Sequence, residues 1–454
     1  MLELKISNWV SVVTSAVFGF SPFMIMRSLG HVVLTEAYFV PLSILLCIWI
    51  YERDDIFRFD KNFFKVPRNY FAILFMLLIA NNGIAYYPFF TCFILVATGI
   101  SKAVKDGKLR SILPSLKFIA GICFFVVLTL VPHFIYVLQN GTNDAVGVRA
   151  GFVESEMYGL KIIQLLLPVD SHNIEIVGKA ITEYNTNSIY VNENITSYIG
   201  LAGIIGLFMK RKNAITQRLG NLAELNIMLI LLGTTGGFGT IFAFIVTSKI
   251  RSYNRISIFI AYVCILAFAL ALDDIYRRIK EKNGKAYKRY IVIVAGSLFC
   301  VLSMFEGFPR GYTPDYETNM YNFNSDDQFV KQIESMVSDE AMIYQLPYHV
   351  YPEGGSENNM WDYHLFTGFI HSDKLRWSYG SVHGRDNDLW NEETSLLPYS
   401  EMVGRLKESG FEGIYIDRRA FSVEDLNSME KQLEEETGSS PIISQNMNLS
   451  FFKF

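Results

Sequence analysis

Long apolar stretches follow one another along the first two thirds of the chain and stop near residue 308. A membrane-crossing helix needs about 20 apolar residues, because the hydrocarbon core is roughly 30 Å thick. Spans are expected at 8–26, 32–50, 112–137, 195–209, 222–247, 256–272 and 290–307. The run 70–100 is too long for one helix and is interrupted by Asn81-Asn82-Gly83, which predicts two short membrane helices forming a hairpin. The pattern predicts a polytopic α-helical membrane domain of about seven spans plus this hairpin.

The remainder of the chain has the pattern of a soluble α/β domain. Helices are expected at 326–337, 401–409 and about 423–437, and strands at 341–346, 413–416 and 449–454. The intervening segment 347–399 is rich in Gly, Asn, Asp and Tyr, which predicts extended surface loops. We therefore divide the chain into a membrane domain, 1–307, and a soluble domain, 308–454.

The balance of charge changes sign at the same point. Residues 1–307 carry 29 Lys and Arg against 19 Asp and Glu, and residues 308–454 carry 11 against 25. Positive charge is retained on the cytoplasmic side of a membrane. The basic segments 51–69, 101–111, 210–212 and 277–289 are therefore expected to be cytoplasmic. Counting spans from them puts the loops 27–31, 138–194 and 248–255 outside, together with the acidic domain.

Composition agrees with a membrane protein, since apolar residues make up 51% of the chain and its mean hydropathy is +0.24. The five cysteines all lie in apolar stretches, so neither a disulfide framework nor a Cys-based zinc site is predicted. An external domain held together without disulfides is more typical of a bacterial envelope than of a secretory lumen. We expect a multi-pass protein of the bacterial cytoplasmic membrane whose C-terminal domain is extracytoplasmic.

Arg27 and His31 stand in the short link expected between the first two spans. A guanidinium forms paired, charge-assisted hydrogen bonds with phosphate. Arg27 is therefore a candidate to bind a lipid phosphate, and His31 is a candidate to support catalysis. The alternative is that Arg27 reaches to the membrane interface and that His31 is structural.

The segment 154–172 has an apolar run that Pro168 ends after a few turns, too short to span a membrane. We expect an interfacial or re-entrant helix with polar groups near its start. A carboxylate in a partly desolvated site suits a general base, so Glu156 is the first candidate and His172 a supporting one. Candidates to contact substrate are Tyr158, Lys161 and Gln164. Alternatively, Glu154 and Glu156 only favour a helix N-terminus.

A glycine-rich run, 233–239, interrupts the span that starts near Leu222. Such backbone is tolerated at membrane depth where it is buried or lines a cavity. Lys249, Arg251 and Arg255 follow it in a loop expected outside, where positive charge is not usual. Arg251 and Arg255 are therefore candidates to bind lipid phosphate, and the alternative is that they anchor the chain at the interface.

The acidic domain holds four of the seven histidines, but their spacing matches no metal-ligand motif, so no metal site is predicted. A divalent cation is the only cofactor left open. Trp377 is a candidate to stack on a sugar, although its ring suits anchoring a loop on the core equally well. The chain has no phosphate-binding loop of the Walker type and no dinucleotide fingerprint. An ATP-driven pump is not indicated, and we expect no nucleic-acid partner.

Several segments resemble bacterial integral-membrane glycosyltransferases of the GT-C type. They include Arg251-Ser-Tyr-Asn-Arg255 and Ala85-Tyr-Tyr-Pro-Phe-Phe90, and further ones at 20–31, 156–168, 345–347, 375–380 and 413–417. The resemblance covers nearly the whole chain. It implies transfer of a sugar from a polyprenyl-phosphate carrier to an envelope glycan or lipid on the external face. In this hypothesis Arg27, Arg251 and Arg255 hold the donor, which is anchored among membrane lipid, and stabilise its leaving phosphate.

That family usually carries a catalytic acidic residue in the first external loop. The loop expected here, 27–31, contains no Asp or Glu. On this interpretation the chain lacks the N-terminal catalytic loop of longer relatives. The alternative function is non-catalytic: a transporter, flippase or assembly subunit for envelope polysaccharide, since discontinuous spans also build transport sites. The enzyme is favoured because the charges gather at the external surface rather than at the bilayer midplane.

Overall fold

The computed structural model describes residues 1–27, 31–61, 63–82, 85–148, 150–169, 172–188, 213–281, 286–308 and 314–454. The chain folds into two compact units. Unit 1 comprises Met1–Gln139 and Arg149–Tyr312, and unit 2 comprises Asn140–Val148 and Thr313–Phe454. The boundary expected at 307/308 lies beside the second junction, whereas nothing in the hydropathy pattern marks 140–148 as part of unit 2.

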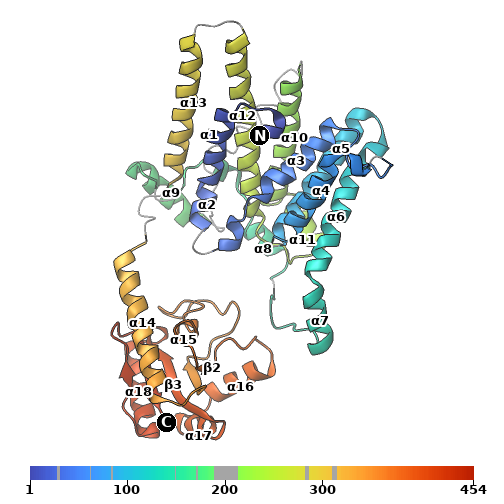
Figure 1. The fold of residues 1–454 in the computed structure, drawn as a ribbon. Coiled ribbons are helices and arrows are strands. Elements are labelled where there is room, and N and C mark those ends of the chain that lie inside the picture. The colour runs from blue at the N-terminus through green and yellow to red at the C-terminus, as the bar shows by residue number, and fades with distance from the viewer. Residues whose placement is uncertain are drawn as a thin grey trace. The chain divides into compact units, whose positions relative to one another are not determined.

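Unit 1 is built from helices (Figure 1). They are α1 (Asn8–Gly19), α2 (Pro22–Arg27), α3 (Phe39–Glu52), α4 (Pro67–Ala80), α5 (Tyr86–Asp106), α6 (Leu113–Thr129), α7 (Val131–Asn140), α8 (Val153–Met157), α9 (Glu175–Asn187), α10 (Ala214–Gly233), α11 (Phe238–Ile245), α12 (Ser257–Glu281) and α13 (Ala286–Gly307). Short 3-10 helices add η2 (Val32–Thr35), η5 (Ile162–Leu165) and η8 (Tyr253–Ile256).

Within the described part of the chain, six helical segments are long and apolar enough to cross a membrane. They are Asn8–Arg27, Val32–Glu52, Tyr86–Asp106, Leu109–Thr129, Tyr253–Glu281 and Tyr287–Phe305. The mainly helical unit is therefore confirmed, and six of its helical segments have the length and composition of membrane spans. The span expected at 195–209 lies outside the described residues.

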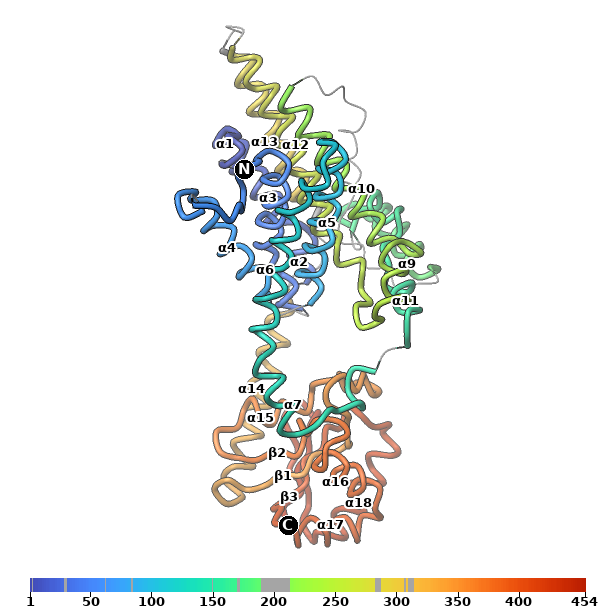
Figure 2. Tube along the Cα trace, turned by 90° about the vertical axis from the view of Figure 1, so that its right-hand side faces the viewer, coloured from blue at the N-terminus to red at the C-terminus, as the bar shows by residue number. Residues whose placement is uncertain are grey.

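α12 is the central helix of unit 1. Nearly every side chain between 257 and 273 is buried, as expected for a helix that is apolar on all sides. It packs against α1, α3, α10 and α13, and its antiparallel pairing with α13 can be followed in Figures 1 and 2.

The interrupted run 70–100 forms α4 and α5, which separate after Ala80 as the asparagines predict. The two helices are unequal, however. α4 is short, but α5 has 21 residues and is long enough to span, so the expectation of two short helices is wrong for α5. α5 then packs closely on α6, because a Cβ at Gly99 would lie 2.8 Å from the Cβ of Ser115.

Charged side chains pair at one end of unit 1, which we call the basic end. Arg218 near the start of α10 pairs with Glu52 at the end of α3, with an N···O distance of 2.5 Å. Lys105 near the end of α5 pairs with Glu224 of α10 at 2.6 Å. These contacts put the α3–α4 and α5–α6 connections at the basic end. The opposite end, which we call the site end, holds the α2–α3 and α4–α5 connections and the turn after α10.

Unit 2 contains a five-stranded sheet in the order β2-β1-β3-β5-β4. The strands are β1 (Met342–Leu346), β2 (Arg376–Trp377), β3 (Phe411–Asp417), β4 (Ile442–Ile443) and β5 (Leu449–Lys453). β1 pairs in parallel with β2 and β3, whereas β5 pairs antiparallel with β3 and β4.

Helices cover both faces of this sheet, because strand side chains alternate between two apolar cores. Ile343 and Tyr415 belong to the core that includes α14 (Tyr316–Met336). Tyr344 and Ile414 belong to the other, which includes α17 (Tyr399–Glu408) and α18 (Val423–Thr437). The elements expected from periodicity at 341–346, 401–409, 413–416, 423–437 and 449–454 all form.

Two expectations for this unit need correction. α14 begins at Tyr316, ten residues earlier than the apolar spacing indicated, because Asp315 caps it by accepting a hydrogen bond from the Thr318 N–H. The segment 347–399 is not all loop: it also contains α15 (Phe366–His371), β2 and α16 (Asp386–Ser395). Turn-forming residues between these short elements conceal them in the sequence.

The segment 140–148 is held to the rest of unit 2 through the turn at 383–385. Arg385 Nη1 donates to the carbonyl of Asn140 at 2.7 Å, and Asn143 Nδ2 donates to the carbonyl of His383 at 2.8 Å. Gly384 has φ +77°, and a Cβ there would lie 2.6 Å from the Cβ of Ala145. The chain thus leaves unit 1 after α7, binds within unit 2 and re-enters unit 1 before α8.

Candidate functional site

The candidate site starts from the way α10 ends. The helix stops at Gly233, where its last carbonyl accepts a hydrogen bond of 2.7 Å from the Leu160 N–H. The Leu160 carbonyl in turn accepts from the Thr235 N–H at 3.1 Å. This short parallel bridge requires glycine, because a Cβ at Gly159 would lie 2.9 Å from backbone atoms of Thr235. Residues 159–160 are therefore fixed against the turn after α10.

This bridge corrects the expectation of a single interfacial or re-entrant helix that begins near Glu156 and ends at Pro168. α8 covers only Val153–Met157, Leu160 is extended against α10, and η5 forms a separate turn at Ile162–Leu165. The pairing outweighs the local helical pattern, because it satisfies backbone groups that the helix end would otherwise leave without partners.

Glu154 and Arg251 meet on this framework. Arg251 Nη1 lies 3.1 Å from Glu154 Oε2, and the two side chains are 28% and 12% exposed. The guanidinium also lies 5.2 Å from the centre of the Tyr158 ring. The Asn254 N–H donates to the Tyr158 carbonyl at 3.0 Å. The loop before α12 and the turn after α8 therefore form one structure.

Tyr86, the first residue of α5, joins both arginines of that loop. Its hydroxyl accepts hydrogen bonds from the Arg251 N–H at 3.3 Å and the Ser252 N–H at 3.4 Å. The Arg255 guanidinium lies over the Tyr86 ring, 4.6 Å from its centre. Cation–π contacts of this kind hold a guanidinium against one face of a ring.

The next residue, Tyr87, brings in Arg27. The buried Tyr87 hydroxyl donates to the Leu34 carbonyl at 2.9 Å, and both Arg27 and Arg255 interact with this tyrosine electrostatically. Arg27 itself is buried at the end of α2, 6.0 Å from the Phe23 ring centre. The three arginines proposed from the sequence therefore gather around the first turn of α5. We call Arg27, Arg251 and Arg255 the arginine cluster.

The connection between α2 and α3 differs from the expectation in a way that affects function. The apolar segment Val32–Glu52 is not one continuous helix, because η2 ends at Thr35 and α3 begins at Phe39. Glu36 therefore lies in the connection between α2 and α3, which extends beyond 27–31. Its carboxylate accepts a hydrogen bond of 3.3 Å from Asn82 Nδ2 in the α4–α5 connection. The first link therefore does contain an acidic side chain. The hydropathy pattern did not indicate this acidic residue, because Glu36 is a single charge within an otherwise apolar stretch.

The other residues predicted for this site have mixed surroundings. Glu156 is partly exposed, and its carbonyl accepts from Thr235 Oγ1 at 3.3 Å. Gln164 is buried and its side chain accepts from the Lys161 N–H, while Lys161 Nζ donates to Ser188. Burial lowers the pKa of Lys161. Packing thus accounts for Lys161 and Gln164 more directly than substrate contact does.

The two histidines are placed very differently. His31 is exposed in the α2–α3 connection, where its N–H donates to the Arg27 carbonyl at 2.9 Å. His172 is buried, and its Nδ1 accepts a hydrogen bond of 3.1 Å from the Ile174 N–H. A ring nitrogen occupied in this way fixes the turn before α9, so a structural role accounts for His172.

An apolar groove of about 630 Å³ opens beside the site. We call it the apolar groove. It lies between the start of α5 and the second half of α6, and its lining includes Pro88, Phe89, Ile122 and Val126. Asn81 and Asn82 line it too, and Asn82 is the residue that binds Glu36. The apolar groove therefore has a polar edge close to the first turn of α5, around which the arginine cluster lies.

Trp377 lies in unit 2, where its ring packs against the core. It makes an edge-on contact with Tyr415 at 5.4 Å, and a Cβ at Gly368 would lie 2.7 Å from the ring. These contacts match the loop-anchoring alternative.

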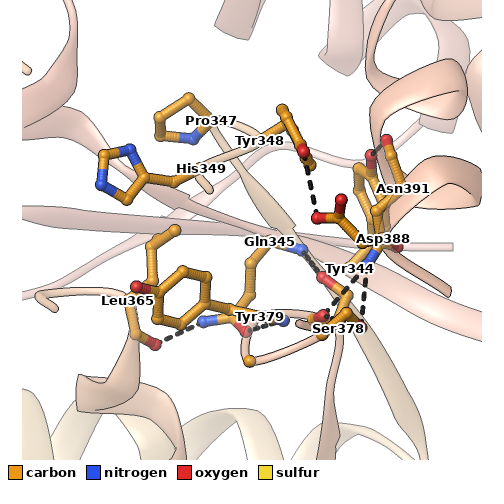
Figure 3. A pocket seen from close by; sticks show the side chains of 12 residues that line it. Tyr344, Gln345, Pro347, Tyr348, His349, Leu365, Ser378, Tyr379, Asp388 and Asn391 are labelled. Atoms are coloured by element: carbon orange, nitrogen blue, oxygen red, sulfur yellow. Dashed lines mark hydrogen bonds between the residues drawn. The ribbon is translucent and has the colours of Figure 1, made fainter. Parts of the chain in front are cut away.

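A small polar cavity lies at the carboxyl end of β1 (Figure 3). The buried Asp388 accepts hydrogen bonds from the Tyr348 hydroxyl at 3.0 Å and the Gly384 N–H at 2.9 Å. The volume of this cavity, about 10 Å³, suffices for roughly one water molecule. Among the residues that the structure describes, no group of three or more His, Cys, Asp or Glu side chains could hold a metal ion.

Neither a family model nor a curated protein sequence matches the chain.

Gly159→Ala should destabilise unit 1, because its methyl group would overlap backbone atoms of Thr235 and separate Leu160 from α10. We expect a loss of about 1–3 kcal/mol, the usual scale for forced overpacking. Thermal unfolding of the purified protein measures it. Gly19→Ala is the control, since a Cβ there has no atom within 4 Å. Equal stability of the two variants would show that the bridge does not hold the site together.

Proposed function

We propose that the protein is a membrane glycosyltransferase that moves a sugar from a polyprenyl-phosphate carrier to an envelope glycan or lipid. The observation that supports this most is the arginine cluster around the first turn of α5, with carboxylates and an apolar groove close by. A lipid-linked sugar phosphate needs both an apolar surface and a cationic group at the membrane interface.

The polyprenyl chain of the donor would lie in the apolar groove. Its phosphate would reach the arginine cluster, because α5 contributes Pro88 and Phe89 to the groove and Tyr86 to the contacts with Arg251 and Arg255. Guanidinium groups stabilise a phosphate as negative charge develops on it during departure. The amino end of α5 adds the positive end of a helix dipole at the same place.

In the transfer step, a hydroxyl oxygen of the acceptor attacks the anomeric carbon of the sugar. The bond from that carbon to the phosphate oxygen breaks, and the phosphate leaves with the electron pair. The proton of the attacking hydroxyl passes to a carboxylate acting as general base. Glu154 is poorly suited to this task, because it is paired with Arg251. Glu156 and Glu36 are the two candidates.

Glu36 has the stronger support of the two. It lies in the first connection of the site end, where the resemblance to GT-C glycosyltransferases implies an acidic residue. Its carboxylate is exposed and bonds Asn82 at the polar edge of the groove. Glu156 is supported by its position beside the Glu154–Arg251 pair on α8.

The groove also favours a second candidate function. Phe89 of the apolar groove contacts Phe242 of α11 at 4.7 Å between ring centres, and a break separates α11 from α10. Such a surface would suit a lipid flippase, since interrupted helices build transport sites in membranes. The two functions predict different products. A transferase releases glycosylated acceptor, whereas a flippase changes only the leaflet in which the lipid-linked sugar is found.

Under this proposal the site end and unit 2 are extracytoplasmic in a bacterial cell, and the basic end faces the cytoplasm. Glu435→Cys on α18 should react with an impermeant thiol reagent in intact cells, whereas Lys280→Cys at the basic end should not. Both side chains are exposed. Labelling is read by mass shift in each variant and in the parent chain. Reaction at residue 280 alone would reverse the orientation.

Arg255→Ala and Arg251→Ala should each weaken binding of polyprenyl phosphate by about 1–3 kcal/mol, the scale of charge-assisted hydrogen bonds. Binding to purified protein in detergent is the measurement. Lys249→Ala is a matched control, because Lys249 is an exposed cation in the same connection. If Lys249→Ala weakens binding as much as the two arginine variants, the effect is general surface charge and not a built phosphate site.

Glu36→Gln should lower the rate of sugar transfer about 10²–10⁴-fold, because the amide keeps the shape but cannot accept the proton. Donor binding should change little. The assay is sugar transfer by purified protein in lipid, with Glu156→Gln and Glu154→Gln measured beside it. A loss confined to Glu156→Gln would assign the base to α8 as the sequence suggested. Full activity in both Glu36→Gln and Glu156→Gln would rule out a carboxylate base from either position.

A further inference from the structure

A second large cavity, of about 490 Å³, opens at the basic end of unit 1. It lies between the α3–α4 connection and the α5–α6 connection, far along the helices from the arginine cluster. Six cationic side chains line it: Arg53, Arg58, Lys102, Lys108, Arg110 and Lys117. Only two carboxylates, Asp54 and Asp60, share the lining, which leaves an excess of four positive charges. We call this cavity the cationic pocket.

Half of these cations already have partners. Arg53 pairs with Asp55 at 3.3 Å, Lys102 pairs with Asp54 at 3.5 Å, and Lys117 Nζ donates to the Phe57 carbonyl at 3.0 Å. The side chains of Arg58, Lys108 and Arg110 make no hydrogen bond or ion pair with any other residue that the structure describes. All three are exposed. Their charges are therefore directed at the cavity and at solvent.

The cationic pocket also has an apolar side. Ile50, Ile56, Leu113 and Pro114 line it. Phe59 of the α3–α4 connection also lines it, and Leu109 stands at the start of the helical segment Leu109–Thr129; these two side chains are 70% and 82% exposed. Large apolar side chains that are exposed at the end of membrane-length helices contact lipid in a membrane protein. A ligand that fills the pocket therefore meets cations at one side and the acyl region of the bilayer at the other.

We propose that the cationic pocket binds the phosphate headgroup of an anionic phospholipid. Basic pockets between membrane helices hold such headgroups, because each Lys or Arg near an anionic lipid surface adds to the attraction. A soluble phosphate would use the cations but not the adjoining apolar surface. The lipid ties the α3–α4 and α5–α6 connections together at the basic end. This site is independent of the glycosyltransferase proposed above.

The test compares two sets of substitutions in the full-length protein. The pocket variant carries Arg58→Gln, Lys108→Gln and Arg110→Gln. The control variant removes three exposed cations that do not line the pocket, Lys61→Gln, Lys65→Gln and Lys288→Gln. Each protein is placed in bilayers of equal parts phosphatidylglycerol and phosphatidylcholine, extracted gently, and the bound lipid is quantified by mass spectrometry.

The parent chain and the control variant should retain phosphatidylglycerol in preference to phosphatidylcholine, and the pocket variant should lose that preference by about tenfold or more. An equal loss in both variants, or no loss in the pocket variant, would overturn the site. Inorganic phosphate added to protein in detergent distinguishes the source. If the pocket variant loses phosphate binding but keeps its lipid preference, the pocket serves a soluble anion and the lipid proposal fails.

Discussion

The hydrogen bonds between Leu160 and the end of α10 are the interaction on which the candidate site depends. The end of a helix leaves carbonyl groups without intrahelical partners. Here the Gly233 carbonyl is satisfied by the Leu160 N–H, and Gly159 permits the approach. Because the bridge fixes residues 159–160, the preceding turn and α8 are placed beside the loop before α12. The Glu154–Arg251 pair is a consequence of this backbone contact.

The first turn of α5 connects this framework to the α2–α3 connection. Tyr86 accepts hydrogen bonds from the loop before α12, whereas Tyr87 donates to Leu34 in the α2–α3 connection. Two neighbouring tyrosines thus join segments that are more than 200 residues apart in the sequence, 34 and 251–252. Both contacts use a hydroxyl on a large apolar ring, which satisfies polar groups while keeping the surroundings apolar. A change in the α2–α3 connection would therefore affect the loop before α12, and the reverse also holds.

Helices and strands whose apolar residues recur at regular spacing were predictable from the sequence. The contacts between these elements were not. β1, β3 and α18 form where apolar spacing placed them, because each buries one face against the sheet or a helix. Glu36 was missed, because one carboxylate among apolar neighbours does not interrupt a hydropathy pattern, although it lies outside α3. The short α8 was misjudged for a different reason. Its end is set by pairing with residues 233–235, and pairing at that distance leaves no local signal.

The pairing of Arg251 with Glu154 also constrains how a phosphate could bind. A guanidinium held by a carboxylate is positioned before the ligand arrives, so less side-chain entropy is lost on binding. The same carboxylate competes for the guanidinium, so it lowers the net affinity for a phosphate in the ground state. Charge that accumulates on a departing phosphate shifts this competition towards the phosphate. A paired arginine beside Tyr158 and Tyr86 therefore favours an anion whose negative charge increases after binding over an anion whose charge stays constant.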